Sequence, residues 1–137
     1  MAVKPAQPTF RRGEGMEFLV YLQNLEPEPL DLMFVNHATW DFDVMVFRAD
    51  GQLVPLRPSV IAGREQARRH PELMVDTRTF STIDSAKAPR TKQLWLEEFV
   101  DIEEPGTYSL VVAWIARNPR PEDQLVVSNL VTFEVEE

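Results

Sequence analysis

The sequence predicts an all-β fold, an antiparallel sandwich of seven to nine strands, in one domain that spans residues 1–137. Three observations predict it. Apolar residues alternate with polar ones in many short segments, which is typical of half-buried strands. Turn residues separate these segments at spacings near ten residues, as in sandwiches and barrels. The apolar share of 44% in 137 residues is enough for a hydrophobic core.

The first half of the chain contains five predicted features of this fold. Residues 1–8 carry two prolines and are expected to form an extended lead-in. Met16–Leu25 places Met16, Phe18, Val20 and Leu22 on one face, and Leu30–Val35 and Phe42–Phe47 alternate in the same way. Asp50-Gly51 then predicts a hairpin, because glycine adopts the positive φ that such turns require.

The last third predicts three more strands, over about Gln93–Val100, Thr107–Ala116 and Gln124–Glu136. Pro105 and Gly106 occupy the central positions that a type II turn prefers. A final loop is expected at Asn118–Asp123. Because the chain has no cysteine, the sandwich must depend on apolar packing, from Phe18, Val20, Tyr108, Leu110, Val112 and Phe133.

The segment from Arg57 to Lys92 differs in charge and pattern from the rest. It holds eight basic and four acidic residues, a charge of about +4, which leaves about −12 for the remainder of a chain at −8. Its apolar residues lack a sustained period, so the sequence predicts a long irregular insertion over 57–92. Val60-Ile61 and Leu73–Val75 are candidate short strands, and Gly63–His70 is a candidate helical turn.

Composition and charge exclude several classes of protein. A net charge of −8 disfavours nucleic acid as the partner. No apolar run approaches the ~18 residues of a spanning helix, so we expect a soluble protein without membrane insertion. Met1–Pro8 lacks the apolar core of a signal peptide. The compartment stays open: extracytoplasmic if a signal peptide has been removed, otherwise cytoplasmic. The oligomeric state is open too.

Catalytic and metal-binding patterns are weak. His37 lies near Asp41 and Asp43, and two carboxylates on one strand face could contribute to a calcium site. A surface or turn role for His37 and solvated acids is the alternative, because a metal site needs more convergent ligands. There is no Gly-x-Ser-x-Gly motif. We therefore expect no cofactor, no metal and no enzymatic activity.

Partner binding is the functional class that the residues favour. Arg64, Arg68, Arg69 and His70 could contact an acidic protein surface, or they could pair with the acids of the protein itself. Trp40 is also a candidate contact, and like Trp95 it could be exposed, as suits protein or sugar binding. Apolar residues on both faces of Thr107–Ala116 suggest that a partner or the middle segment covers the outer face.

One segment resembles a known structural motif. Asp101–Leu110, with Pro105, Gly106 and Tyr108, resembles the corner between the fifth and sixth strands of immunoglobulin-like domains, and the wider pattern is similar to bacterial immunoglobulin-like modules. The resemblance implies that the Tyr108 hydroxyl bonds to the backbone upstream while the ring packs inward. It also implies an immunoglobulin-like antiparallel β-sandwich.

A second resemblance concerns function. Asp41–Val44 and Asp50–Val54, with the later Pro105–Tyr108, are similar to the bacterial intracellular proteinase inhibitor family, whose β-sandwich blocks serine proteases. Two functional hypotheses follow. The first is a non-catalytic binding or accessory module that contacts another protein through loops and one sheet face. The alternative is a proteinase inhibitor that acts through an exposed loop.

Overall fold

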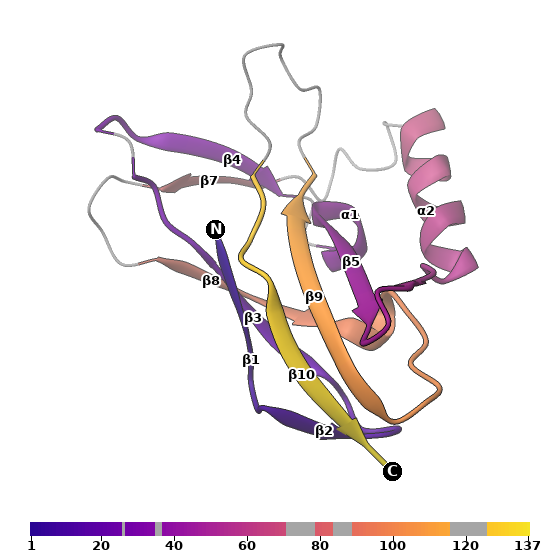
Figure 1. The fold of residues 1–137 in the computed structure, drawn as a ribbon. Helices are drawn as coiled ribbons and strands as arrows, with labels where there is room; N and C mark the ends of the chain where they lie inside the picture. The colour runs from indigo at the N-terminus through magenta and orange to yellow at the C-terminus, as the bar shows by residue number, and fades with distance from the viewer. Residues whose placement is uncertain (26, 35–36, 71–78, 84–88, 116–125) are drawn as a thin grey trace.

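The computed structural model of the chain describes residues 1–25, 27–34, 37–70, 79–83, 89–115 and 126–137 (Figure 1). Two main sheets form the body. The first has the order β1 (Ala2–Pro5), β3 (Glu17–Leu22), β8 (Arg90–Trp95). The second has the order β2 (Thr9–Arg11), β10 (Val131–Glu136), β9 (Gly106–Trp114), β5 (Phe42–Arg48), β6 (Leu53–Val54). The predicted all-β sandwich is therefore confirmed.

The core lies between the two sheets and is built from the alternating residues of each strand. Phe18 and Val20 of β3 are fully buried, and Leu110 and Val112 of β9 meet them from the other sheet. Phe10, Phe18, Phe133 and Tyr108 form a cluster of rings in which the Phe18 and Phe133 centroids are 5.1 Å apart. All six residues that the sequence predicts for the core are buried.

The N-terminal segment contributes strands to both sheets, so residues 1–8 are more than the lead-in that the sequence predicts. β1 pairs antiparallel with β3, and β2 then pairs parallel with β10. The crossing is made at residues 6–8, where Pro8 follows two residues outside any ladder. Proline is tolerated there because it has no amide to donate to a ladder. The segment is extended, as expected, but it forms an edge of each sheet.

Asn129 connects this N-terminal edge to the opposite sheet. Its Oδ1 accepts a hydrogen bond from the Val3 amide at 2.9 Å, and its Nδ2 donates to the Val3 carbonyl at 3.1 Å. The side-chain amide thus pairs with β1 as a peptide group of a neighbouring strand would. The residue that interrupts the alternation of Gln124–Glu136 closes an otherwise open edge.

Asn129→Ala is expected to lower the free energy of unfolding by about 1–2 kcal/mol, because two partly buried backbone groups lose their partners. The loss should be local to β1, so the Val3 amide should exchange its hydrogen faster while the Val20 amide of β3 keeps its protection. Urea unfolding and amide exchange measure the two effects. Unchanged exchange at Val3 would show that Asn129 does not hold the edge.

Tyr108 lies at the start of β9 and makes the predicted contact. Its hydroxyl donates a hydrogen bond to the Glu104 carbonyl at 2.7 Å, and its ring is stacked on Phe133 in the core. Burial raises the pKa of the Tyr108 phenol. The predicted type II turn is wrong: Gly106 is already the first residue of β9, with φ of 149°, far from the ~80° of that turn.

Tyr108→Phe is expected to lower the free energy of unfolding by about 1 kcal/mol at neutral pH, since the hydroxyl bond is lost while the ring still packs. The native pKa of Tyr108 lies above the unfolded value near 10, so the native fold favours the neutral phenol. Its contribution is complete below pH 10 and is lost as the pH rises through the native pKa. Urea unfolding at pH 8 and pH 11 should therefore show a smaller alkaline loss in the variant than in the original protein.

The segment 57–92 contains regular structure, which corrects the prediction of an irregular insertion. α2 (Pro58–Arg69) follows Arg57, and Pro58 occupies the first helical turn, where its missing amide costs nothing. The predicted strand at Val60-Ile61 is wrong, because both residues lie in α2. Only Val60 and Ala67 of this helix are buried, so its apolar stripe is too sparse to reveal a helical period. The candidate strand Leu73–Val75 lies outside the described residues.

Another strand of this segment, β7, belongs to a separate two-stranded ribbon. β4 (Leu30–Phe34) pairs antiparallel with β7 (Thr79–Ile83). Along the chain, β4 follows β3 and precedes α1, and β7 follows α2 and precedes β8. The two arms of the ribbon therefore link the first sheet to α1 and α2 (Figure 1).

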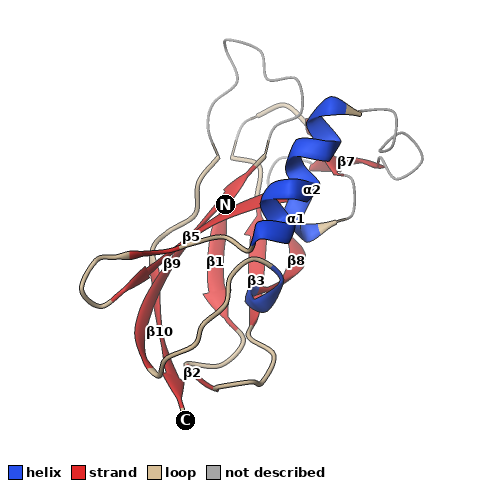
Figure 2. Cartoon of the chain, turned by 90° about the vertical axis from the view of Figure 1, so that its right-hand side faces the viewer, coloured by secondary structure: helices blue, strands red, loops and turns tan. Residues whose placement is uncertain are grey.

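The strand predicted over Gln93–Val100 ends earlier. β8 stops at Trp95 and the 3-10 helix η2 (Leu96–Glu98) follows. The predicted Asp50-Gly51 hairpin between β5 and β6 is confirmed, with Gly51 at φ of 84°. The one-turn helix α1 (Ala38–Asp41) precedes β5, and both α-helices lie on the same side of the sandwich (Figure 2). Neither described helix has the length and apolar character needed to cross a membrane.

Candidate functional site

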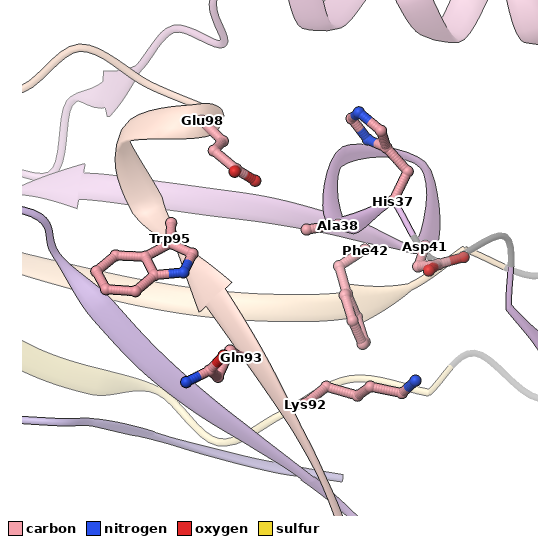
Figure 3. Close-up of a pocket in the computed structure, with 8 residues that line it drawn as sticks. All are labelled: His37, Ala38, Asp41, Phe42, Lys92, Gln93, Trp95 and Glu98. Atoms are coloured by element: carbon pink, nitrogen blue, oxygen red, sulfur yellow. The ribbon is translucent and has the colours of Figure 1, made fainter.

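Two adjoining pockets open between the helical side and the β8 side of the molecule. The first, of about 370 Å³, is lined from one side by α1 and from the other by β8 and η2 (Figure 3). The second, of about 400 Å³, lies between α1 and the first half of α2. Both are lined by His37 and Glu98, so they form one continuous surface, which we call the His37 groove.

The His37 side of the groove is an aromatic pair. His37 precedes α1, and its ring stacks on Trp40 with centroids 5.1 Å apart. The hydroxyl of the buried Thr39 lies 2.9 Å from His37 Nδ1, within hydrogen-bond distance. α2 supports the pair from below, because Ala67 packs against Trp40. The exposed His37 ring is thus held in place by Thr39 and by Trp40, which Ala67 supports in turn.

Trp95 forms the opposite wall of the first pocket. It is the last residue of β8, and 37% of it is exposed. Gly15 carries the other side of the indole: a Cβ built on this glycine would lie only 2.8 Å from Trp95 Cζ3. The lack of a side chain at Gly15 therefore lets the ring lie directly on the backbone, which fixes an exposed aromatic surface without enclosing it.

The charges in the first pocket are unequal. Asp41 and Glu98 supply two carboxylates and Lys92 supplies one ammonium group. The exposed Glu98 carboxylate makes no hydrogen bond or ion pair with any residue that the structure describes, whereas the Gln93 amide donates to Glu17 Oε1 at 2.8 Å. The groove therefore presents a solvated carboxylate beside a fixed indole ring.

The expected pairing of Asp41 and Asp43 on one strand face is wrong. Asp41 ends α1 and is buried at the first pocket, and the strand begins only at Phe42. Asp43 Oδ1 accepts a hydrogen bond from Arg64 Nη1 at 2.8 Å. In the described part of the chain, no group of three or more His, Asp or Glu side chains is placed to hold a metal ion.

Arg64 connects α2 to the elements below it. Besides the ion pair with Asp43, its guanidinium donates to the Thr39 carbonyl at 3.0 Å and to the Phe42 carbonyl at 2.9 Å. These carbonyls lie near the C-terminal end of α1, where a helix leaves such groups without partners of its own. Arg64 is therefore a support of the groove, placed behind it.

The other predicted basic contacts lie at the far end of α2. Arg68 and Arg69 both donate to the Glu65 carboxylate, three and four residues earlier on the helix. Hydrogen bonds from Arg68 and Arg69 hold the pKa of Glu65 below its ordinary value, and the same pair raises the pKa of Arg68. His70 caps the helix through its amide. None of these three basic residues lines either pocket of the groove.

Of the predicted contact residues, only Trp40 lines the groove. Sequence reasoning did not connect Trp95, Glu98 and Gln93 with His37, because 55 or more residues separate them along the chain. One signal was present: Trp95 places a large aromatic ring at the outward position of its strand, between the buried Leu94 and Leu96. A scan against models of protein families finds no match to this sequence, and a search of curated proteins finds none.

Proposed function

We propose that the sandwich is immunoglobulin-like and that it serves as a non-catalytic binding module for another protein. The strand order supports the fold. β3 and β8 take the places of strands B and E in one sheet, and β5, β9 and β10 take those of C, F and G in the other. The N-terminal strand shared between the sheets and the Tyr108 bond to Glu104 at the start of β9 support the same assignment.

The observation that supports binding is the His37 groove, in which a solvated carboxylate is flanked by exposed rings. Aromatic residues are enriched at the centres of protein interfaces, where they supply a large contact area with few rotatable bonds. Trp95, Trp40 and His37 are each held by packing before any partner arrives. Prior ordering lowers the entropic cost of association. The proposed contact surface is the groove, with loops of the partner inserted between α1 and η2.

A photo-crosslinking experiment tests this function. A benzophenone amino acid is placed at Gln93, inside the groove, and in a matched protein at Thr132, an exposed position of β10. In extracts of the source cells, position 93 should yield a discrete crosslinked protein. An excess of protein without the benzophenone should prevent formation of this crosslinked product, and the Trp95→Ala substitution should abolish it. The position 132 protein should not yield that product.

Three results would contradict the proposal: no discrete product from position 93, the same product from position 132, or a product that survives Trp95→Ala. Reversal of Arg68 and Arg69 to Glu is the comparison for the basic end of α2. Because neither residue lines the groove, the double reversal should weaken the crosslink less than Trp95→Ala. A larger loss in the reversed protein would move the contact surface to α2.

The proteinase inhibitor remains the alternative function, and a panel of serine proteases separates it from the first. The loop predicted at Asn118–Asp123 lies outside the described residues. Slowed hydrolysis by any of the proteases in the presence of the intact chain would favour the inhibitor. Unaffected rates, or digestion of the chain, would count against it.

A further inference from the structure

We propose that the first pocket of the His37 groove binds an arginine side chain of the partner, with the guanidinium stacked on Trp95 and paired with Glu98. This inference rests on the proposed binding function and names the chemistry that the groove recognises. The partner would be a protein with a basic, exposed segment, and the occupant of the pocket would be one of its arginine residues.

The geometry of the pocket is suited to a planar cation. The indole of Trp95 is 37% exposed and is fixed on the Gly15 backbone, so one face is available without a rearrangement. Guanidinium groups stack on such faces more often than ammonium groups do, because they are planar and weakly hydrated. Glu98 follows Trp95 by three residues and lines the same pocket, so a stacked cation would have a carboxylate beside it (Figure 3).

The charge of the pocket favours a cation over an anion. Among its charged lining residues, Glu98 is the exposed one, whereas Asp41 is buried and Lys92 is half-buried, and both of these make internal interactions. Glu98 has no ion pair among the described residues, so a ligand cation would not have to displace an internal one. The chain as a whole carries −8, which attracts basic segments at long range and speeds their association.

Titration with a short peptide tests this pocket directly. The probe is an acetylated, amidated Gly-Gly-Arg-Gly-Gly peptide, and its match is the same peptide with citrulline, which keeps the shape and removes the charge. In two-dimensional NMR spectra, the arginine peptide should shift the Trp95 indole N–H and the Gln93 amide in a saturable way. We expect the citrulline peptide to bind about tenfold more weakly, since both the ion pair and the stacking of a cation are lost.

Matched variants show whether binding of the arginine peptide depends on the first pocket. Glu98→Gln should weaken binding of the arginine peptide about threefold, as expected for an exposed ion pair. Glu14→Gln removes the same charge from an exposed position outside the pocket and should leave the affinity unchanged. Gly15→Ala leaves every polar group of the pocket in place but displaces the indole, so it should weaken binding as well.

Equal affinity for the arginine and citrulline peptides would overturn the inference, as would equal losses in Glu98→Gln and Glu14→Gln. The crosslinking experiment keeps the two proposals apart. If the crosslink at position 93 depends on Trp95 but Glu98→Gln leaves it unchanged, protein binding stands and arginine recognition fails. If the peptide binds as expected but no crosslinked protein forms, arginine recognition stands and the binding function fails.

Discussion

Phe18→Ala is expected to lower the free energy of unfolding by about 3–5 kcal/mol, the largest effect of any substitution considered. The Phe18 side chain is fully buried between the two sheets, and its ring lies 5.5 Å from Phe10 and 5.1 Å from Phe133, measured between centroids. These partners come from β2 and β10 of the other sheet, so truncation removes two ring contacts across the core and leaves a cavity. The total free energy of unfolding of a typical domain is only about 5–15 kcal/mol.

Urea unfolding followed by intrinsic tryptophan fluorescence measures this loss. Leu53→Ala is the matched control, because Leu53 lies in β6 of the same sandwich and is 58% exposed. The control should change the free energy of unfolding by less than about 0.5 kcal/mol. Similar losses in the two variants would show that the ring cluster is not the centre of the core.

Arg64→Ala is expected to cost about 2 kcal/mol and to act locally. The substitution removes three hydrogen bonds to Thr39, Phe42 and Asp43, and it leaves two carbonyls near the end of α1 without this donor. α2 has few buried side chains of its own, so its amides should exchange hydrogen faster while those of β9 do not. Amide exchange in the original and variant proteins measures this.

Two controls give the Arg64 result its meaning. Arg64→Lys keeps the charge but cannot reach three acceptors with one compact ammonium group, so most of the loss should remain. Arg68→Ala removes an exposed arginine that bonds to Glu65 of its own helix, and it should leave the free energy of unfolding almost unchanged. Full stability of Arg64→Lys would show that charge alone, without the three-way geometry, holds α2.

Much of the sandwich could be predicted because the alternation of apolar residues in the sequence indicates which side chains of each strand are buried. In β3 and in the centre of β9, from Tyr108 to Val112, every second residue is buried, so the period of two in the sequence is the period of the core. Tyr108 could be predicted for a similar reason: its hydrogen bond to Glu104 is local, only four residues away. The hairpin at Asp50-Gly51 could be predicted because its turn requires a positive φ, which glycine adopts readily.

The rest depends on contacts between distant parts of the chain. α2 is held by Arg64, which bonds to residues more than 20 positions earlier, and by a narrow stripe of Val60 and Ala67. No pattern within the helix contains that information. The His37 groove is similar, because Trp95 and Glu98 meet α1 only after the sheets form. The fixed position of Trp95 depends on a missing side chain at Gly15, which no local rule assigns to that role.

The strand exchange at the N-terminus has a mechanical consequence. When the two chain ends are pulled apart, β2 and β10 are drawn in opposite directions along their common axis, because they run parallel with Phe10 opposite Val135. Their ladder is then loaded in shear, and its bonds must break together, whereas a hairpin such as β5–β6 opens one pair at a time when its ends are separated. Resistance to stretching is set by the rate of that rupture. Tension on this domain would therefore be resisted by the parallel pairing of β2 with β10.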